Sequence, residues 1–180
     1  MQRRLTPLGG ALAFLCLAPF VVPGIVLAIG FYAAYAPPPC ALYGTAAIMI
    51  LAFTTRFLPI AYANSAAAVR GINPEMEDAV RILGGGRLRA VRDVVAPLLR
   101  RSLIGAWLLV FIPATRELST AIFLYGPNTK VMSVVLLNLT DEGSLEAAAA
   151  LGLLMLAAIL AIVLSGYALI GRDFMVRRSE

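Results

Sequence analysis

Two long stretches of the chain contain no charged side chain. One runs over residues 5–55 and the other over residues 147–171. A membrane-spanning α-helix needs about 20 consecutive apolar residues, so each stretch is long enough to cross a bilayer. Three prolines at 37–39 interrupt the first stretch, and a helix interior does not accommodate proline without losing a backbone hydrogen bond. The first stretch therefore predicts a helical hairpin that crosses the membrane twice.

The hydrophobic pattern as a whole predicts an all-α membrane protein with about four transmembrane helices. We expect these helices over residues 11–35, 42–62, 102–124 and 147–171. The segment between the second and third helices, residues 64–101, carries too many charges to lie in lipid. We expect it to lie in water or against a protein partner. The chain, residues 1–180, is predicted to form a single transmembrane domain.

The arginines outside the predicted helices indicate how the chain is oriented. Cytoplasmic loops of membrane proteins carry an excess of lysine and arginine. With four crossings, the arginines before the first helix, within residues 64–101 and after the fourth helix all fall on one side, whereas the other side has only Lys130. Both termini and the 64–101 segment are therefore expected to be cytoplasmic.

Composition excludes several other classes of protein. The chain is 61% hydrophobic and 14% charged, which does not fit a soluble domain. It contains no histidine, and its two cysteines, Cys16 and Cys40, lack the spacing of a zinc site. Its net charge of +5 comes from basic residues at the ends of apolar segments, so we expect no nucleic-acid partner. The sequence predicts a non-enzymatic protein embedded in membrane lipid, with no metal site and no cofactor.

The 64–101 segment has the pattern of helix, sharp turn, helix. Asn73 suits an N-cap and Pro74 the first helical position. Gly84 begins a run of three glycines that ends the first helix, and Pro97 predicts a bend before the next crossing. Apolar residues recur at helical spacing on one face of each helix. Such a hairpin could lie on the bilayer surface or dock into a groove of a partner protein.

The spacing within this hairpin resembles the EAA loop in the permease subunits of ATP-binding-cassette (ABC) importers. That loop reads E-A-A, three residues, G, nine residues, I-x-L-P, and here DAV at 78–80 is followed at the same spacing by Gly84 and by VVAP at 94–97. Glycine and proline match in identity. In that family the loop is a coupling helix that docks into a groove of the ATP-binding subunit. The resemblance implies a coupling role for Glu77, Asp78, Ala79, Val80, Gly84 and Pro97.

Further segments are similar to the second half of the ferric-iron type of importer permease. They are PGIVLAIGF at 23–31, LAFTTRFLPIAYA at 51–63 and FIPATRELSTAIFLYGPNTKVMSVV at 111–135, and the resemblance covers residues 18–171. Such permeases begin with further helices, so the chain is expected to be N-terminally incomplete. A non-transporting fragment of a split permease gene is therefore an alternative to a working permease, and a membrane anchor or assembly factor is another.

The resemblance also implies partners and a location. Such a permease works in the bacterial inner membrane with an ABC ATP-binding subunit, a periplasmic or lipid-anchored substrate-binding protein, and a second permease half or copy. Ferric iron is the solute that the resemblance favours. Thiamine, polyamines and molybdate stay open because their importers share the loop. The implied function is to couple ATP hydrolysis by the separate subunit to solute uptake.

Charges occur within the predicted crossings only at Arg56, Arg116 and Glu117. A charge at the bilayer centre costs about 2.5–3.5 kcal/mol, so these side chains should face the bundle interior or water. Arg116 and Glu117 point about 100° apart on a helix and are not expected to pair, whereas Glu117 and Arg56 are. Pro113 can break the third helix and free backbone groups that are tolerable only along a cavity. We predict that Arg56, Pro113, Arg116 and Glu117 line the translocation pathway, with a structural ion pair and an ordinary proline kink as alternatives.

Overall fold

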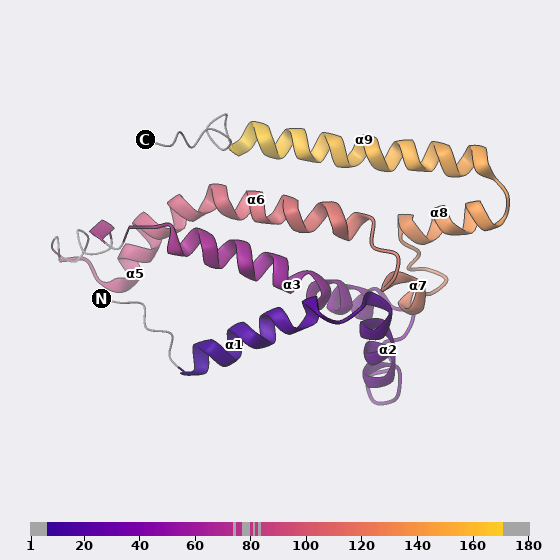
Figure 1. The fold of residues 1–180 in the computed structure, drawn as a ribbon, viewed down its shortest axis with the longest axis horizontal. Coiled ribbons are helices and arrows are strands. Elements are labelled where there is room, and N and C mark those ends of the chain that lie inside the picture. The colour runs from indigo at the N-terminus through magenta and orange to yellow at the C-terminus, as the bar shows by residue number, and fades with distance from the viewer. Residues whose placement is uncertain (1–6, 74, 77–79, 81, 83, 171–180) are drawn as a thin grey trace.

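The computed structural model describes residues 7–73, 75–76, 80, 82 and 84–170, and it is built from helices (Figure 1). No strand occurs among the residues that it describes. In chain order the elements are α1 (Pro7–Leu17), the 3-10 turn η1 (Ala18–Phe20), α2 (Gly24–Tyr35), α3 (Ala46–Arg70), α5 (Arg87–Ala90), the π-helical turn η2 (Val91–Val95), α6 (Ala96–Thr115), α7 (Ala121–Leu124), α8 (Met132–Asp141) and α9 (Leu145–Ile170). The predicted all-α class is confirmed.

Three long helices form the body of the molecule. α3, α6 and α9 run side by side, α1 lies along α3, and α2 turns away from α1 (Figure 1). α3 and residues Leu145–Ala168 of α9 are each long and apolar enough to cross a membrane. Two bent pairs, α1 with α2 and the two arms of the rod that contains α6, raise the number of candidate spans to as many as four. The predicted count of four requires each bent pair to be one span.

The first predicted helix, residues 11–35, is wrong as a continuous element. The chain breaks at residues 21–23, and the helical arms Gly9–Phe20 and Gly24–Tyr35 are bent by 110° from each other. Proline has no amide hydrogen to donate, and Pro23 takes the extended conformation before α2, with a ψ of 142°. Hydropathy alone does not reveal this break because both arms are apolar.

The other predicted helices are present with shifted ends. α3 begins four residues later than the predicted 42–62 helix and continues to Arg70, because residues 61–69 are rich in alanine, the strongest helix former. The first residues of the 64–101 segment are therefore helical. The predicted 102–124 helix is divided into α6, which already begins at Ala96, and the separate α7. α9 begins two residues before the predicted 147–171 helix.

The predicted caps within the 64–101 segment are present at the residues that the structure describes. Oδ1 of Asn73 accepts a hydrogen bond from the amide of Glu75 at 3.0 Å, as an N-cap does. Gly84 has a φ of +77° and the amide of Gly85 donates to the carbonyl of Val80 at 2.8 Å. This combination is the Schellman geometry of a helix end, and it requires glycine at the left-handed position.

Pro97 shapes the start of α6. A proline ring clashes with the carbonyl four residues before it and offers no amide hydrogen. The helix accommodates Pro97 through the π-helical turn η2, after which the amide of Ala96 donates to the carbonyl five residues back. The rod then bends by 47° between Arg100 and Ser102. The bend predicted at Pro97 therefore occurs about one turn later.

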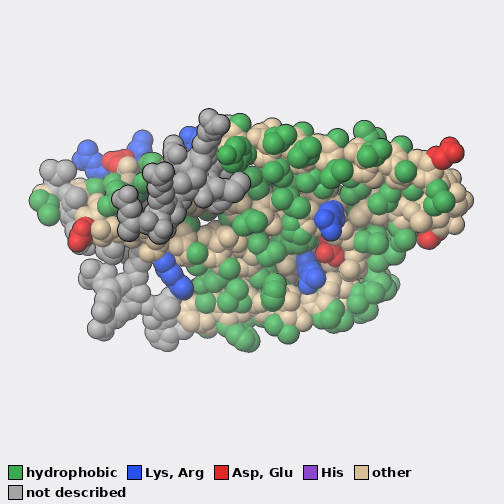
Figure 2. Space-filling model, turned by 45° about the horizontal axis from the view of Figure 1, so that its top comes forward, with side chains coloured by type: hydrophobic (Ala, Val, Ile, Leu, Met, Phe, Trp, Pro, Cys, Tyr) green, Lys and Arg blue, Asp and Glu red, His purple; other side chains and the backbone are tan. Residues whose placement is uncertain are grey.

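The buried core lies where α2, α3, α7 and α8 meet. Its members are Ala28, Ile48, Met49, Ala52, Ala121, Leu124 and Val134. α9, by contrast, is apolar from residue 147 onward and packs on α6 and α8 along one side, while most of its side chains are exposed. Figure 2 shows hydrophobic side chains over most of the visible face. A helix that is apolar and exposed in this way is suited to contact with lipid.

Two glycines bring the loops beside this core into backbone contact. A Cβ at Gly126 would overlap the carbonyl oxygen and the Cα of Gly44. The hydroxyl of Thr129 donates to the carbonyl of Gly44 at 3.0 Å and accepts from the amide of Gly126 at 2.8 Å. The α2–α3 loop and the α7–α8 loop can lie this close only because residue 126 has no side chain.

Candidate functional site at the break between α6 and α7

The third predicted crossing is interrupted, and the candidate site forms at the interruption. α6 ends at Thr115, two residues after Pro113, and α7 begins at Ala121. The amides of Arg116 and Glu117 donate to the carbonyls three residues before them, at 3.2 and 3.3 Å, so α6 ends in a tightened turn. The backbone groups between the two helices need partners from elsewhere in the molecule.

Glu117 supplies several of these partners. Its Oε1 accepts a hydrogen bond from the amide of Thr120 at 2.9 Å and from the hydroxyl of Thr120 at 3.2 Å. Its backbone carbonyl accepts a hydrogen bond from the hydroxyl of Ser133 in α8, at 2.8 Å. Thr120 is fully buried and the Glu117 side chain is 12% exposed. The carboxylate therefore satisfies the amide and the hydroxyl of Thr120, the residue that precedes α7.

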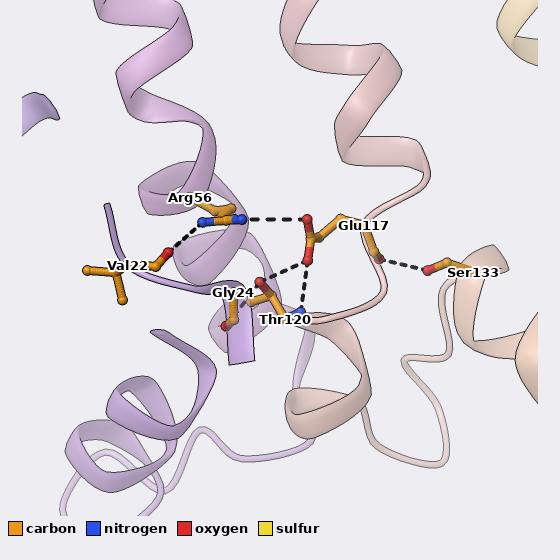
Figure 3. A network of polar contacts seen from close by, with 6 residues as sticks. All are labelled: Val22, Gly24, Arg56, Glu117, Thr120 and Ser133. Atoms are coloured by element: carbon orange, nitrogen blue, oxygen red, sulfur yellow. Dashed lines mark hydrogen bonds and ion pairs between the residues drawn. The ribbon is translucent and has the colours of Figure 1, made fainter. Parts of the chain in front are cut away.

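Arg56 connects this break with the break at residues 21–23, before α2. Its Nε lies 4.0 Å from Oε2 of Glu117, and its Nη1 donates to the carbonyl of Val22 at 2.7 Å. Val22 lies between α1 and α2, so one side chain from α3 contacts both breaks (Figure 3). Freed backbone groups at membrane depth must be satisfied by other protein groups or by water in a cavity. Arg56 does this for the carbonyl of Val22.

Gly24, the first residue of α2, permits this arrangement. A Cβ there would lie 3.0 Å from the Thr120 hydroxyl and 3.1 Å from Oε1 of Glu117. The hydroxyl of Thr120 also lies 3.4 Å from the carbonyl of Gly24, a long hydrogen bond. Within the described part of the chain, no buried side-chain nitrogen or oxygen lacks a hydrogen-bond partner. The network is therefore an ion pair supported by hydrogen bonds to the hydroxyl and amide of Thr120 and to the carbonyl of Val22.

Two of the predicted pathway residues meet and two lie beside them. The expected pair of Arg56 and Glu117 is present. Pro113 is half-buried in the last turn of α6. Arg116 is exposed, and it makes no hydrogen bond or ion pair through its side chain with any residue in the described ranges. Figure 2 shows a small group of basic and acidic atoms midway along the helices, surrounded by hydrophobic side chains. A role in lining a pathway stays a prediction for all four.

The residues predicted to couple to an ATPase lie elsewhere. Gly84 and Pro97 flank α5 and η2, at the opposite end of α6 from the network (Figure 1). Val80 belongs to the same region and is half-buried. The structure therefore does not bring the two predicted groups together. The remaining predicted coupling residues, Glu77, Asp78 and Ala79, lie outside the described residues.

Sequence reasoning missed four members of the network: Val22, Gly24, Thr120 and Ser133. Ser133 stands in an apolar segment, and Thr120 comes three residues after Glu117, one turn along a helix. A buried hydroxyl needs a hydrogen-bond partner, so both residues could have been proposed from the sequence. Val22 contributes only its carbonyl, and no side chain marks that role. Among the described residues, no group of three or more His, Cys, Asp or Glu could hold a metal ion.

Comparison with known proteins relates the chain to one family. The family model described as "Binding-protein-dependent transport system inner membrane component" matches residues 2–176. The ferric transport system permease protein FbpB of Actinobacillus pleuropneumoniae is 29% identical over 153 residues, which cover 85% of this chain and 22% of that protein.

Two further relatives are matched over larger shares of their own length. The putative 2-aminoethylphosphonate transport system permease protein PhnV of Salmonella paratyphi A is 24% identical over 146 residues, which cover 81% of this chain and 55% of that protein. The putative ferric transport system permease-like protein AfuB of Escherichia coli is 31% identical over 92 residues, which cover 51% of this chain and 77% of that protein. The chain thus spans about a fifth of the FbpB relative and about half of the PhnV relative.

Proposed function

The chain belongs to the family of binding-protein-dependent transport system inner membrane components, and we propose that it is a transmembrane permease component of a bacterial ABC importer. In this role it couples ATP hydrolysis by a separate ATP-binding subunit to the uptake of a solute that a substrate-binding protein delivers. A second permease half or copy completes the path. The family match over residues 2–176 supports this assignment for nearly the whole chain.

The observation that carries the proposal is the pair of helix breaks tied together by Arg56 and Glu117. Non-helical backbone at membrane depth is tolerated only where it is buried in protein or lines a water-filled cavity. We place the solute path beside the α6–α7 break, with the exposed Arg116 facing it. A guanidinium that faced lipid at the bilayer centre would cost about 2.5–3.5 kcal/mol.

We place the contact with the ATP-binding subunit on the 64–101 segment. Two apolar side chains there are among the most exposed in the described chain, Ile82 at 85% and Leu88 at 83%. No atom lies within 4 Å of a Cβ built at Gly84, so the turn is open to a partner. Exposed apolar side chains beside a free turn suit the insertion of a short helix into a groove. Contact with the bilayer surface is the competing role for the same residues.

Ferric iron is the solute we favour. Relatives named as ferric transport permeases support it, and the relative named as a 2-aminoethylphosphonate permease makes a small phosphonate the second candidate. Thiamine, polyamines and molybdate are supported only by the loop that their importers share. We assign solute selection to the binding protein, because the family is described as dependent on one.

The proposal is tested in the assembled importer. The chain is produced with its ATP-binding subunit, its binding protein and a second permease half, and it is purified by a tag on the chain. We expect the ATP-binding subunit to co-purify and the loaded binding protein to stimulate ATP hydrolysis. Loading with ferric iron or with 2-aminoethylphosphonate in separate assays identifies the solute.

Matched glycine variants test the coupling segment in the same assay. Gly84→Val should lower co-purification and stimulated hydrolysis several-fold, because valine is strained by about 1–2 kcal/mol at the φ of +77°. Gly86→Val is the control, since Gly86 also has open space around it but lacks a positive φ. Asp78→Lys should weaken docking by reversing a charge on the same hairpin.

Each result has a defined meaning. If the wild-type chain retains no ATP-binding subunit, or the loaded binding protein leaves hydrolysis unchanged, the chain is a non-transporting fragment. If Gly84→Val and Asp78→Lys both behave as wild type, the 64–101 segment is an interfacial hairpin and the coupling assignment is wrong.

A further inference from the structure

A groove runs along the bent rod formed by η2 and α6, away from the Arg56–Glu117 network. It has a volume of about 1090 Å³, and its described lining includes Arg92, Ala96, Arg100, Leu103, Ile104 and Trp107. These residues come from both arms of the rod, whose axis bends by 47° between Arg100 and Ser102. The groove therefore extends across the bend.

The lining changes from basic to apolar along the groove. Arg92 and Arg100 stand in the arm before the bend, and Leu103, Ile104 and Trp107 stand in the arm after it. At 1.5 Å per residue, the two arginines lie roughly 12 Å apart along the helix, and Arg100 lies roughly 10 Å from Trp107. The basic part thus meets the apolar part where the chain becomes hydrophobic enough to enter a membrane.

The two arginines are not neutralised by the rest of the described chain. Arg92 and Arg100 are exposed, and neither side chain forms a hydrogen bond or ion pair with another residue in the described ranges. The neighbouring Arg89 differs, because its Nε lies 3.4 Å from a carboxylate oxygen of Asp93. Two free guanidinium groups therefore border the polar part of the groove.

We propose that this groove binds an anionic phospholipid, with its phosphate at Arg92 and Arg100 and one acyl chain along Leu103, Ile104 and Trp107. The planar guanidinium group matches phosphate geometry, and anionic lipids attract basic residues that lie next to a membrane segment. Tryptophan is favoured at the level where headgroups meet acyl chains, and Trp107 is 53% exposed and stacked on Phe111.

Other occupants fit only part of the groove. An acidic surface of a soluble protein matches the arginines but not Leu103, Ile104 and Trp107, which lie in the apolar arm. An apolar helix of another permease chain matches that arm but leaves two charges without a partner. A phospholipid presents a charged headgroup followed by an apolar chain, which is the order of basic and apolar residues along the rod. Such a lipid would contact both arms of the rod, before and after the bend.

The test uses the single tryptophan of the chain, Trp107, which reports on the groove directly. The full chain is placed in nanodiscs of phosphatidylcholine and phosphatidylglycerol, in which one lipid or the other carries brominated acyl chains that quench tryptophan on contact. Fluorescence then gives the relative occupancy of the two lipids beside Trp107. No ATP-binding subunit, binding protein or solute is present, so the result does not depend on the proposed transport function.

We expect brominated phosphatidylglycerol to quench Trp107 more than brominated phosphatidylcholine, with a preference of about fivefold for each arginine. The double variant R92Q/R100Q should bring the ratio close to one. Lys130→Gln removes an exposed cation outside the groove and should keep the wild-type ratio. High salt should reduce the preference of the unmodified chain, because it screens exposed charges.

Two results overturn the proposal. Equal quenching by the two lipids in the wild-type chain means that ordinary boundary lipid fills the groove. Absence of quenching by either lipid means that protein, such as a second copy of the chain, covers it. If the double variant does not fold, as judged by circular dichroism, the wild-type ratio and its salt dependence decide the question.

Discussion

Glu117 shows how one side chain can hold a break in a membrane helix. Its carboxylate accepts two hydrogen bonds from Thr120 and faces Arg56. Without its charge, Arg56 would keep, among the described residues, only the neutral carbonyl of Val22 as a partner. A largely buried cation that loses its counter-charge is costly. Glu117 therefore has a structural role that does not depend on any role in transport.

We predict that Glu117→Gln destabilises the protein. Glutamine keeps the shape and the acceptor oxygen for Thr120 but lacks the charge that faces Arg56, so the free energy of unfolding should fall by about 1–3 kcal/mol. The control is Glu142→Gln, because Glu142 is exposed and forms no part of the network; it should change this value by less than ~0.5 kcal/mol. Thermal unfolding in detergent compares the two, and equal midpoints would remove Glu117 from this structural role.

At the scale of elements, the sequence predicted features that depend on neighbours in the chain. The Asn73 cap and the Gly84 turn each involve groups within a few residues, so their residue types were sufficient evidence. The break at residues 21–23 was missed because both arms are apolar, and the group that satisfies its freed carbonyl, Arg56, lies 34 positions away from Val22. A proline in a long apolar run fits either a kinked helix or a break, and its position alone does not distinguish the two.

The contact between the two loops leads to a second prediction. Gly126→Ala should destabilise the protein by about 1–3 kcal/mol, because its methyl group would overlap the backbone of Gly44 and push the loops apart. Gly152→Ala in α9 is the matched control, since no atom lies within 4 Å of a Cβ there and alanine favours a helix. Thermal unfolding of the two variants is again the measurement. A loss of stability no larger in Gly126→Ala than in Gly152→Ala would mean that the loop contact is dispensable.

At the scale of the whole molecule, one end gathers the start of α1, the α5–η2 segment and the end of α9 (Figure 1). The loops around α7 and α8 lie at the other end. This arrangement is what an orientation with both chain ends and the 64–101 segment in the cytoplasm requires. Only the distribution of arginines indicates which end of the molecule is cytoplasmic, so this orientation stays a prediction.

Cysteine labelling tests that orientation. A membrane-impermeant thiol reagent applied outside intact cells should label Cys40, which is exposed in the loop after α2. The same reagent should label Arg87→Cys, in a chain with both native cysteines replaced, only after the membrane is permeabilised. Labelling of both positions in intact cells would contradict the four-crossing topology.

The contacts of Arg56 also bear on the order in which the chain is synthesised. Val22 leaves the ribosome before Arg56, whereas Glu117 follows about 60 residues later. At a synthesis rate of 5–20 residues per second, Glu117 is added roughly 3–12 s after Arg56. During that interval the carbonyl of Val22 is already available to accept its hydrogen bond. The carbonyl at the first helix break can thus accept a hydrogen bond from Arg56 before Glu117 has been synthesised.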